Sequence, residues 1–588
     1  MLAGILLLAV GPAFAAPGPR HKQQPADDNS SRPVSACEPS LLDSPFIPVD
    51  SWVYPAMLRL YSLGFVDNVF LGMRPWTRAS VSHMLEQAGA RIDDADAGPA
   101  TDEAQAIYEA LSEEINPDME GPCGSLQGKT RVESIYTVMR GISGTPLRDS
   151  FHLGQTIIND YGRPYAGGLN NYSGASGYAS SGRFTLYVRG EFQGSPSATG
   201  YSTGLAQTLS TIDTIPFLNP ATGRPYNQAT IPLGPIASVA DFRIIEAYAS
   251  THVLNHEISF GKQDDWLGPG LGAGMAYSNN AENVYSFRID RIEPLHIPLL
   301  SYLTGPFRYD FLVGSLKGHV APNAPWMHVE KISFRPTENL EFGFERTVIW
   351  GGKGHVPITL HSFLKSFFSF SGVPASEKFS RNDPGARFGA FDFSYRLPFV
   401  RNWLTLYSDG EVHDDVSPID APRRASWRPG IYLSHVPGVP KLDLRVEAVT
   451  TDPPVSTSNG GHFMYWEVVQ KQGYTNKGML LGDWIGREAK GGQGWITYHL
   501  SGNEWIQAGV RNQKIAKDFI PGGTTLNDVN FQVVKRVGRD FEINGNFALE
   551  HWKAPIYPTG TPVYPAPQNT VTTTTIQLTW FPSRKVSF

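Results

Sequence analysis

Adjacent acidic residues are the side chains of this sequence with the clearest catalytic potential. They occur as Asp264-Asp265 and as Asp414-Asp415. Glycoside hydrolysis needs two carboxyl groups on either side of a sugar, roughly 5 to 9 Å apart. Adjacent residues of a strand point to opposite faces, so a strand would not arrange either pair for that reaction. We interpret both pairs as turn, calcium-binding or loop residues. They are the first carboxylates to mutate if the protein is a secreted enzyme.

A glycine-rich run, Gly268–Gly274, invites comparison with a phosphate-binding loop. It has neither the GxGxxG spacing nor the Lys-Ser/Thr end of such loops, and Pro269 removes a backbone donor. We interpret the run as a connection between strands or as a loop folded into a pore. His355 and His361 match no zinc-protease spacing. The sequence therefore predicts no catalytic residue, no cofactor and no metal site.

Composition excludes some functions and favours others. The 588 residues carry a net charge of -6, so the chain lacks the basic excess by which nucleic-acid-binding proteins gain affinity. Aromatic residues make up 12% of the chain. Charged residues make up only 18%, below the roughly 25% of soluble domains. We expect a fold that requires many aromatic side chains and few charged ones. We expect no nucleic-acid partner.

The first residues read as an export signal. Leu2–Val10 is a short apolar run, and Ala13-Phe14-Ala15 has the small-x-small form that signal peptidase cuts. We predict a signal peptide over residues 1–16 and a polar, proline-rich lead over residues 17–44. In an oxidising compartment Cys37 and Cys123 could form a disulfide, and two unpaired buried thiols are the alternative.

Helical spacing follows over residues 45–125. Tyr54, Met57, Leu58 and Tyr61 fall on one helix face. Further along the chain, Thr77 and Thr101 are typical N-cap residues for a second and a third helix. We predict a small three-helix unit.

After about residue 127 the hydrophobic period becomes two and stays so to the end. Phe184, Leu186 and Val188 alternate with polar or aromatic neighbours, and the same pattern recurs between Gly, Pro, Asn and Asp clusters. The resulting prediction is a large all-β region over residues 127–588. About 18 antiparallel strands of about 10 residues fit its length, as do 16 or 20.

The strands read as membrane-spanning rather than as a soluble sandwich. Aromatic residues crowd the segment ends, where the interfacial girdle of a membrane barrel would lie. They are Trp350, Trp403, Tyr407, Tyr432, Trp466, Trp495 and Trp552. The chain also ends on an amphipathic strand with Phe588 as its last residue, a signal that barrel-assembly machinery recognises. We predict a transmembrane barrel embedded in outer-membrane lipid.

The stretch Phe260–Arg291 resembles the Wzi capsule assembly family. Members of that family show a Trp-Gly-Pro-Gly element, then a Ser-Asn-Asn-Ala turn and a strand ending near Arg-x-Asp. This chain has Trp266–Gly270 with one inserted Leu, then Ser278–Ala281 and Arg288–Asp290. Further segments resemble the family in the same order: Leu63–Val66, Arg74–Thr77, Asn159–Pro164, Asp443–Glu447 and Tyr474–Gly486.

The resemblance implies an outer-membrane barrel whose periplasmic mouth is closed by the helical bundle. It also implies a lectin that holds capsular polysaccharide at the cell surface, without enzyme activity. Sugar recognition needs flat rings and planar polar groups. The stretch offers these in Trp266, Asp265, Asn279, Asn280, Arg288 and Asp290. Loop structure or lumen packing is the alternative role of each.

Two other functions share part of this evidence. A porin or outer-membrane channel for sugars or other solutes would show the same strands, although a simple porin needs no helical unit of this size. A secreted β-rich carbohydrate-active enzyme would be water-soluble instead. We favour the polysaccharide-binding barrel, with a closed lumen and no conductance.

Overall fold

The computed structural model describes residues 43–115, 129–413, 424–453, 460–582 and 585–587. Several predicted features lie outside the described residues. They are the signal peptide of residues 1–16, nearly all of the lead of residues 17–44, Cys37, Cys123, Asp414-Asp415 and Phe588.

A helical bundle precedes the strands, as the spacing predicts. Its helices are α1 (Val53–Leu63), α2 (Arg78–Asp93) and α3 (Pro99–Ile115). The predicted cap of α2 is confirmed, since the Thr77 side chain accepts a hydrogen bond from the backbone N–H of Ser80. Apolar faces of the three helices form one buried cluster, which also includes Tyr407 and Tyr432 of the barrel wall.

The predicted start of α3 is wrong by three residues, because a helix capped by Thr101 would begin at residue 102. The helix begins at Pro99, and Thr101 lies inside it, where its hydroxyl donates to the carbonyl of Asp96 at 2.8 Å. A proline suits the first helical position because its φ is already helical and it has no N–H to leave unpaired. Thr101 therefore closes the preceding turn instead of capping the helix.

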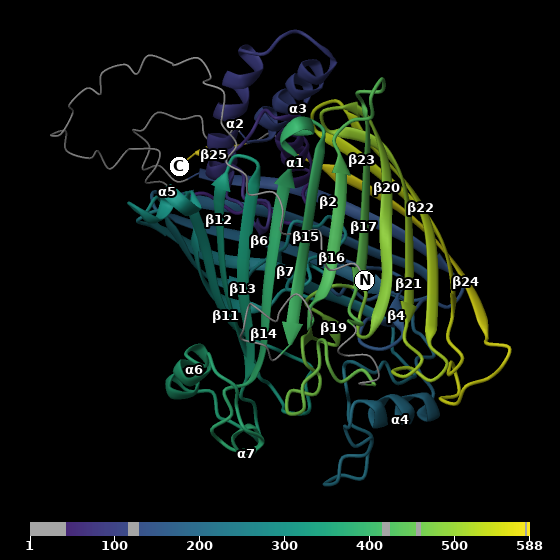
Figure 1. Ribbon diagram of the computed structural model, residues 1–588. Helices are drawn as coiled ribbons and strands as arrows, with labels where there is room; N and C mark the ends of the chain where they lie inside the picture. Colours follow the sequence, from purple (N-terminus) through teal and green to yellow (C-terminus); the bar gives the residue numbers. More distant parts are fainter. Residues whose placement is uncertain (1–42, 116–128, 414–423, 454–459, 583–584, 588) are drawn as a thin grey trace.

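The strands form a closed antiparallel barrel of 18 strands, which confirms the predicted fold class (Figure 1). The first nine are β2 (Lys129–Ser143), β5 (Gly168–Ser181), β6 (Phe184–Ser195), β7 (Val239–Val253), β8 (His256–Lys262), β10 (Tyr285–Arg291), β11 (Phe307–Ser315), β12 (Trp326–Thr337) and β13 (Leu340–Trp350). The others are β14 (Ala386–Arg396), β15 (Leu404–His413), β16 (Ser426–Leu433), β17 (Leu442–Thr450), β20 (Ala489–Ser501), β21 (Glu504–Ile515), β22 (Thr524–Val537), β23 (Phe541–Lys553) and β24 (Gln568–Trp580). Strand β24 pairs with β2 and closes the barrel, and the short β25 (Lys585–Ser587) extends that edge.

Shorter elements lie in the connections. The paired short strands are β1 (Met73–Arg74) with β9 (Trp266–Leu267), β3 (Arg148–Asp149) with β4 (Gly154–Gln155), and β18 (Thr475–Asn476) with β19 (Met479–Leu480). The remaining helices are α4 (Thr203–Ile212), α5 (Leu300–Thr304), α6 (Leu360–Phe367), α7 (Ala375–Lys378) and a 3-10 turn, η3 (Pro398–Val400). Within the described ranges, no helix combines the length and apolarity needed to cross a bilayer.

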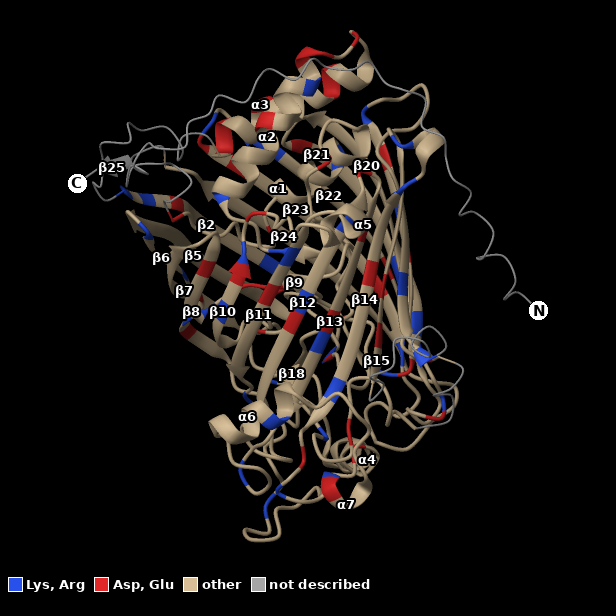
Figure 2. Ribbon diagram, turned by 60° about the vertical axis from the view of Figure 1, so that its left-hand side comes forward, with Lys and Arg blue, Asp and Glu red and all other residues tan. Residues whose placement is uncertain are grey.

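Side chains alternate between the two faces of the wall as a membrane barrel requires. On β6, Phe184, Leu186 and Val188 are exposed on the outside, whereas Thr185 and Arg189 are buried inside. Charged residues lie along the strands of the wall (Figure 2), and buried cations and acids of different strands meet on the inner face, as Arg288 does with Asp310 and Lys331 with Asp392. An apolar outer face with a polar inner face is the pattern of strands that cross a membrane.

The predicted aromatic girdle is wrong for most of the residues that suggested it. Tyr407, Tyr432 and Trp552 are buried because strand parity turns them inward toward the bundle and the loops. Trp350 is buried for another reason, since Phe363 of α6 packs against its ring. Other rings occupy the outer face near the turns, among them Phe184, Phe541 and Trp580. The last two stack with ring centres 6.4 Å apart.

The two ends of the barrel differ in their connections. At the end that carries the bundle, here called the bundle end, most connections are short, such as residues 182–183, 338–339 and 502–503. At the opposite end, here called the loop end, the connections are long and include residues 196–238, 351–385 and 451–488, with α4, α6 and α7 (Figure 1).

Candidate functional site

The structure places the six residues expected to contact sugar inside the barrel, where they are buried. Trp266 and Asn279 line a cavity of about 560 Å³ between the bundle and the wall. Trp266 belongs to β9, which pairs with β1 of the bundle segment, and the guanidinium of Arg74 lies 5.4 Å from its ring centre. The indole N–H of Trp266 and the amide oxygen of Asn279 have no hydrogen-bond partner among the described residues. These two are the predicted residues with free polar groups facing a cavity.

Arg288 and Asp290 hold neighbouring strands together. Arg288 donates to both carboxylate oxygens of Asp310 on β11, at 2.9 and 2.6 Å. Asp290 accepts from Arg308, also on β11, at 3.1 and 2.8 Å. Asp265 lies 3.7 Å from Arg288 and joins the same group of charges. These three side chains therefore form ion pairs inside the barrel wall.

Asn280 connects two loops inside the barrel. Its side-chain oxygen accepts from the backbone N–H of Asn159 at 3.1 Å, and its amide donates to the carbonyl of Leu480 at 3.2 Å. Because both groups of the amide are engaged, Asn280 fixes the loop that carries Asn279.

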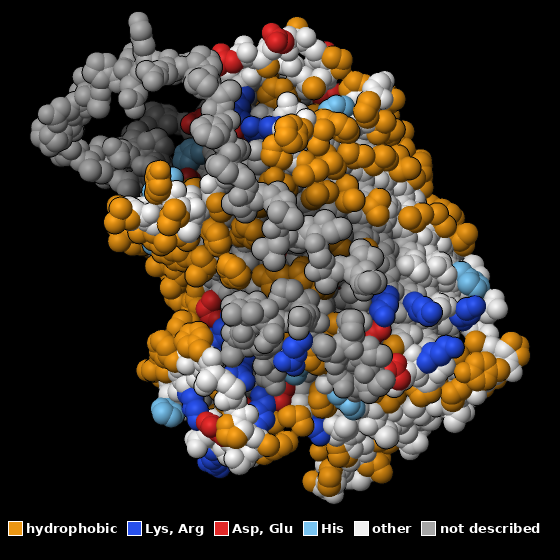
Figure 3. Space-filling view, viewed as in Figure 1, with side chains coloured by type: hydrophobic (Ala, Val, Ile, Leu, Met, Phe, Trp, Pro, Cys, Tyr) orange, Lys and Arg blue, Asp and Glu red, His pale blue; other side chains and the backbone are white. Residues whose placement is uncertain are grey.

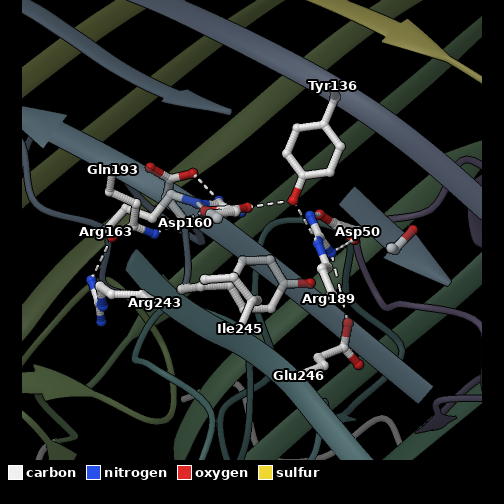
Figure 4. A network of polar contacts seen from close by, with 12 residues as sticks. Asp50, Tyr136, Asp160, Arg163, Arg189, Gln193, Arg243, Ile245 and Glu246 are labelled. Carbon is white, nitrogen blue, oxygen red and sulfur yellow. Dashed lines mark hydrogen bonds and ion pairs between the residues drawn. The ribbon is translucent and has the colours of Figure 1, made fainter. Parts of the chain in front are cut away.

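An ion-pair network crosses the cavity that Trp266 lines (Figure 4). Arg189 of β6 binds both oxygens of Asp50, which precedes α1, at 3.0 and 2.8 Å. It also donates to the hydroxyl of Tyr136 at 3.1 Å. Burial would raise the pKa of Asp50, but its ion pair and hydrogen bonds with Arg189 hold that pKa below the usual range. This pair attaches the bundle segment to the wall.

A second part of the network joins a loop to the same strand. Arg163 donates to Glu191 at 2.8 and 2.6 Å and to Asp160 at 2.7 Å. Nearby, burial and the charge of Asp50 raise the pKa of Asp264 to about 7. The Asp264 carboxylate accepts from the backbone N–H of Val49 and from a tyrosine hydroxyl, at 2.8 and 2.9 Å. These acids serve to join segments of the chain, since each is bonded to protein groups.

The glycine-rich run folds into the lumen, as one of its two interpretations predicts. The backbone N–H groups of Leu271 and Gly272 donate to Glu447 of β17, at 2.7 and 3.0 Å. The N–H of Met275 donates to Asp409 of β15 at 2.6 Å. The run starts from β8 and reaches the opposite wall, so it crosses the inside of the barrel.

A different cavity, of about 630 Å³, lies at the loop end. It is lined by the end of β12 and by the long connection between β13 and β14. Two exposed rings border it, Trp326 at 36% and Phe379 at 64% of full exposure. Lys353 and Arg381 border it as well, and neither forms an ion pair with a described residue. His355 binds Asp383 at 2.8 Å. We call this the loop-end cavity.

Helix α6 fixes the connection that lines this cavity. Its N-terminus has a capping box, in which Thr359 and Ser362 bond each other's backbone N–H at 3.1 and 3.0 Å. Phe363 and Phe367 pack against His328 of β12. Arg346 of β13 donates to the carbonyls at the end of the helix. The connection that carries Lys353, Phe379 and Arg381 is therefore held against β12 and β13 by α6.

Trp326, Lys353, Phe379 and Arg381 were not among the residues expected to contact sugar. The length of residues 351–385 was a signal that could have found the last three, because it is an unusually long interruption of the strand pattern, and such connections often carry function. Their gathering around one cavity depends on strand order, which no local pattern reveals.

Charge is distributed unequally between the two ends (Figure 3). The exposed cations of the loop end are Arg224, Lys317, Lys353, Arg381, Lys477, Lys490, Lys514, Lys517 and Lys553. Among the residues that the structure describes, the exposed acids there are Asp241 and Asp518. The bundle instead exposes Glu86, Asp93, Asp94, Asp96, Asp102, Glu109 and Glu113. The loop end thus attracts anions, although the whole chain is negative.

A buried charge cluster joins three connections of the loop end. His152 lies between Asp149, at 3.0 Å, and Asp213, at 2.8 Å, and all three side chains are fully buried. Asp213 follows α4 and also pairs with Arg487 at 2.7 Å. Burial alone would lower the pKa of His152, but the two aspartates raise it to about 9.

This cluster predicts a loss of stability in alkaline solution. A histidine whose pKa rises from about 6.5 in the unfolded chain to about 9 stabilises the fold fully below pH 6.5 and loses this contribution toward pH 9. We expect roughly 3 kcal/mol to be lost over that range. The thermal midpoint of the folded barrel in detergent, measured from pH 6 to pH 9.5, gives the result. His152→Gln should remove this slope, and an equal slope in that variant would contradict the assignment.

The family model described as "Capsule assembly protein Wzi" matches residues 138–562. A Klebsiella pneumoniae protein described as "Uncharacterized 55.8 kDa protein in cps region" is 25% identical over 218 residues. That match covers 37% of this chain and 42% of the Klebsiella protein, so the chain spans less than half the length of that relative.

Solved structures are similar as well. Wzi from Escherichia coli, described as an outer membrane protein involved in group 1 capsule assembly and a carbohydrate binding β-barrel, has a TM-score of 0.62 with this chain. It is 16% identical, and the match covers 90% of this chain and 98% of that one. At this identity the similarity establishes the barrel fold. OccAB2 from Acinetobacter baumannii, with a TM-score of 0.38 and 10% identity, is too distant to bear on function.

Proposed function

This chain belongs to the capsule assembly protein Wzi family, and from that premise we propose that it is an outer-membrane barrel that binds capsular or other surface polysaccharide at its loop end. Outer-membrane barrels have short periplasmic turns and longer extracellular loops. The loop end is therefore extracellular in this proposal, and the bundle closes the periplasmic mouth. Insertion by the barrel-assembly machinery belongs to the same proposal.

The loop-end cavity is the observation that carries this function. Trp326 and Phe379 offer exposed ring faces against which the apolar face of a sugar can stack. Lys353 and Arg381 offer cations without an acidic partner among the described residues. Rings beside planar hydrogen-bonding groups are the combination that sugar recognition requires.

The charge of the loop end supports an acidic polymer. In the described part of the chain, exposed cations outnumber exposed acids at the loop end, and the bundle at the other end exposes several acids (Figure 3). A polymer that carries carboxylates would be drawn to the extracellular end and repelled from the bundle. Arg381, with its planar fork of donors, is the side chain best suited to bind such a carboxylate.

A lectin fits these observations better than an enzyme or a channel. Asp264 and Asp265, the described acidic pair weighed for catalysis, are buried and bonded to protein groups. A channel would need an open lumen, which the glycine-rich run and the bundle obstruct. Both observations favour binding without chemical change or transport.

Binding measurements on the full-length protein in detergent test the proposal. We expect Trp326→Ala and Arg381→Gln each to weaken binding of an acidic capsular polysaccharide by about tenfold, as central contact residues do. Neutral dextran should bind poorly to every form. Phe399→Ala, which removes a fully exposed ring at the bundle end, should leave binding unchanged.

The same experiment separates the loop-end cavity from the residues near Trp266. If the polymer instead enters from the bundle end, Trp266→Phe and Asn279→Ala would weaken binding, because their free polar groups face the luminal cavity. Loss of binding in those variants with full binding in Trp326→Ala would move the site to the lumen. Equal binding by all variants would contradict the lectin function at either place.

A further inference from the structure

The outer face of one barrel wall carries a row of lysines at the loop end. They are Lys490 of β20, Lys514 of β21 and Lys553 of β23, all exposed. Strand register places them at one height, since Lys490 pairs with Lys514, Lys514 with Thr525, and Thr525 with Lys553. Figure 3 shows blue side chains gathered at this level of the wall. We call these three residues the lysine row.

The next two levels down the wall change from polar to apolar. Directly below the lysine row, on the same outer face, are Asn512, Asn527 and His551, which are paired across the strands. Below these, the outward residues are Val510, Val529 and Leu549, all exposed. The sequence of cation, hydrogen-bonding group and hydrocarbon matches the sequence of phosphate, sugar or ester, and acyl chain in a lipid leaflet.

Of the three cations in the lysine row, only Lys490 has an acidic partner among the described residues. Lys490 binds Asp452 at 2.8 Å. Lys514 and Lys553 form no ion pair with a described residue. The exposed acid in the next loop, Asp518, follows the further cation Lys517. Like charges directly opposite each other on neighbouring strands are destabilising, so Lys490 and Lys514 gain from an external anion.

The row is a local feature of this wall. Strands β5, β6 and β7 present Leu169, Phe192 and Phe242 on their outer face near the same end. A uniform band of cations would suit any anionic surface, whereas a row on four neighbouring strands suits a ligand of about that width. Adjacent strands are about 4.8 Å apart, so the row spans roughly 15 Å.

From this arrangement we propose that the lysine row binds the phosphate groups of a phosphorylated glycolipid in the outer leaflet. The acyl chains of that lipid would lie against Val510, Val529 and Leu549. Its sugars would lie against Asn512, Asn527 and His551 above them. The inference rests on the extracellular placement of the loop end, and it is independent of polysaccharide binding at the loop-end cavity. It places a lipid on the membrane-facing side of the barrel, away from the cavity where the polymer binds.

Native mass spectrometry of the full-length protein in neutral detergent tests this, with a bis-phosphorylated lipid A as the probe. We expect Lys490→Gln/Lys514→Gln/Lys553→Gln to weaken lipid binding at least about tenfold, since each cation near an anionic lipid surface contributes about fivefold. The matched control Arg224→Gln/Lys317→Gln/Lys477→Gln removes three exposed cations from loops outside the loop-end cavity and should bind the lipid normally. The triple Lys→Arg variant of the row should also bind normally.

The remaining outcomes of this experiment either support or overturn the proposal. Weak binding of the dephosphorylated lipid, with no competition from millimolar inorganic phosphate, would support a membrane lipid as the source of the phosphate. Equal binding of the lipid by the triple Gln variant, with its folded band intact on unboiled gels, would overturn the proposal. It would also be overturned if that variant kept the lipid and lost the acidic polysaccharide, because the row would then belong to the polymer site.

Discussion

Gly274→Val is expected to convert a closed barrel into one that conducts ions. A Cβ atom at this position would overlap the backbone oxygens of Leu267 and Tyr277. Both residues belong to the same loop, and a hydrogen bond joins them, since the N–H of Leu267 donates to the carbonyl of Tyr277 at 3.0 Å. Backbone cannot move aside as a side chain can, so the loop must open.

Opening the loop would loosen two other parts that fill the lumen, because β9 of the loop pairs with β1 of the bundle segment. The carbonyl of Met275 accepts from Tyr465 at 2.6 Å, and Ser278 donates to Gly482 at 2.7 Å, so the loop also holds the connection of residues 451–488 in place. An 18-stranded barrel that is not filled by protein encloses an aqueous channel.

Planar-bilayer recordings provide the measurement. The unsubstituted protein should give no current steps, and Gly274→Val should give discrete ones. Gly545→Val is the matched control, because a Cβ there meets no atom within 4 Å and the variant should stay silent. Steps in the unsubstituted protein would favour the porin function. Silence of a Gly274→Val protein whose heat-modifiable band shows it to be folded would mean that the loop does not close the lumen.

Arg428→Met is expected to cost roughly 3 to 5 kcal/mol of barrel stability. Arg428 is fully buried and donates to Glu447 at 2.9 Å, to Asp483 at 2.6 Å and to Gln493 at 2.6 Å. Removing the cation leaves two buried carboxylates without their partner. The penalty is large because neither carboxylate can reach water where it lies.

The concentration of urea that unfolds half of the protein in detergent measures this effect. Arg224→Met removes an exposed arginine of the loop end and should change the unfolding free energy by less than about 0.5 kcal/mol. Adding Glu447→Gln and Asp483→Asn to Arg428→Met should restore part of the loss, because the uncompensated charges disappear. A single Arg428→Met variant as stable as the parent would show that the ion group is solvated.

Local patterns were sufficient for the elements of the fold. The alternation of Phe184 and Leu186 with Thr185 and Arg189 is written in consecutive residues, and it predicts a strand with one face in lipid. Thr77 identified the start of α2 because a cap acts within one turn of helix. Family membership could also be recognised, since the motif order from Trp266 to Asp290 is a property of the chain alone.

Pairing between distant segments decided the roles of individual side chains. The sequence offers Arg288 and Asp290 as free polar groups, but their partners Asp310 and Arg308 come from the neighbouring strand. Tyr407 and Tyr432 lie near strand ends as a girdle requires, yet strand parity and the bundle inside the barrel bury them.

The sequence by itself therefore determined the barrel, the helical bundle and the family, because caps, strand alternation and motif order act over a few neighbouring residues. Only the tertiary structure decided which polar groups remain available for a ligand. Trp326 and Arg381 meet at one cavity, and Lys490, Lys514 and Lys553 form one row, because strand order and register bring together residues that are far apart in the chain.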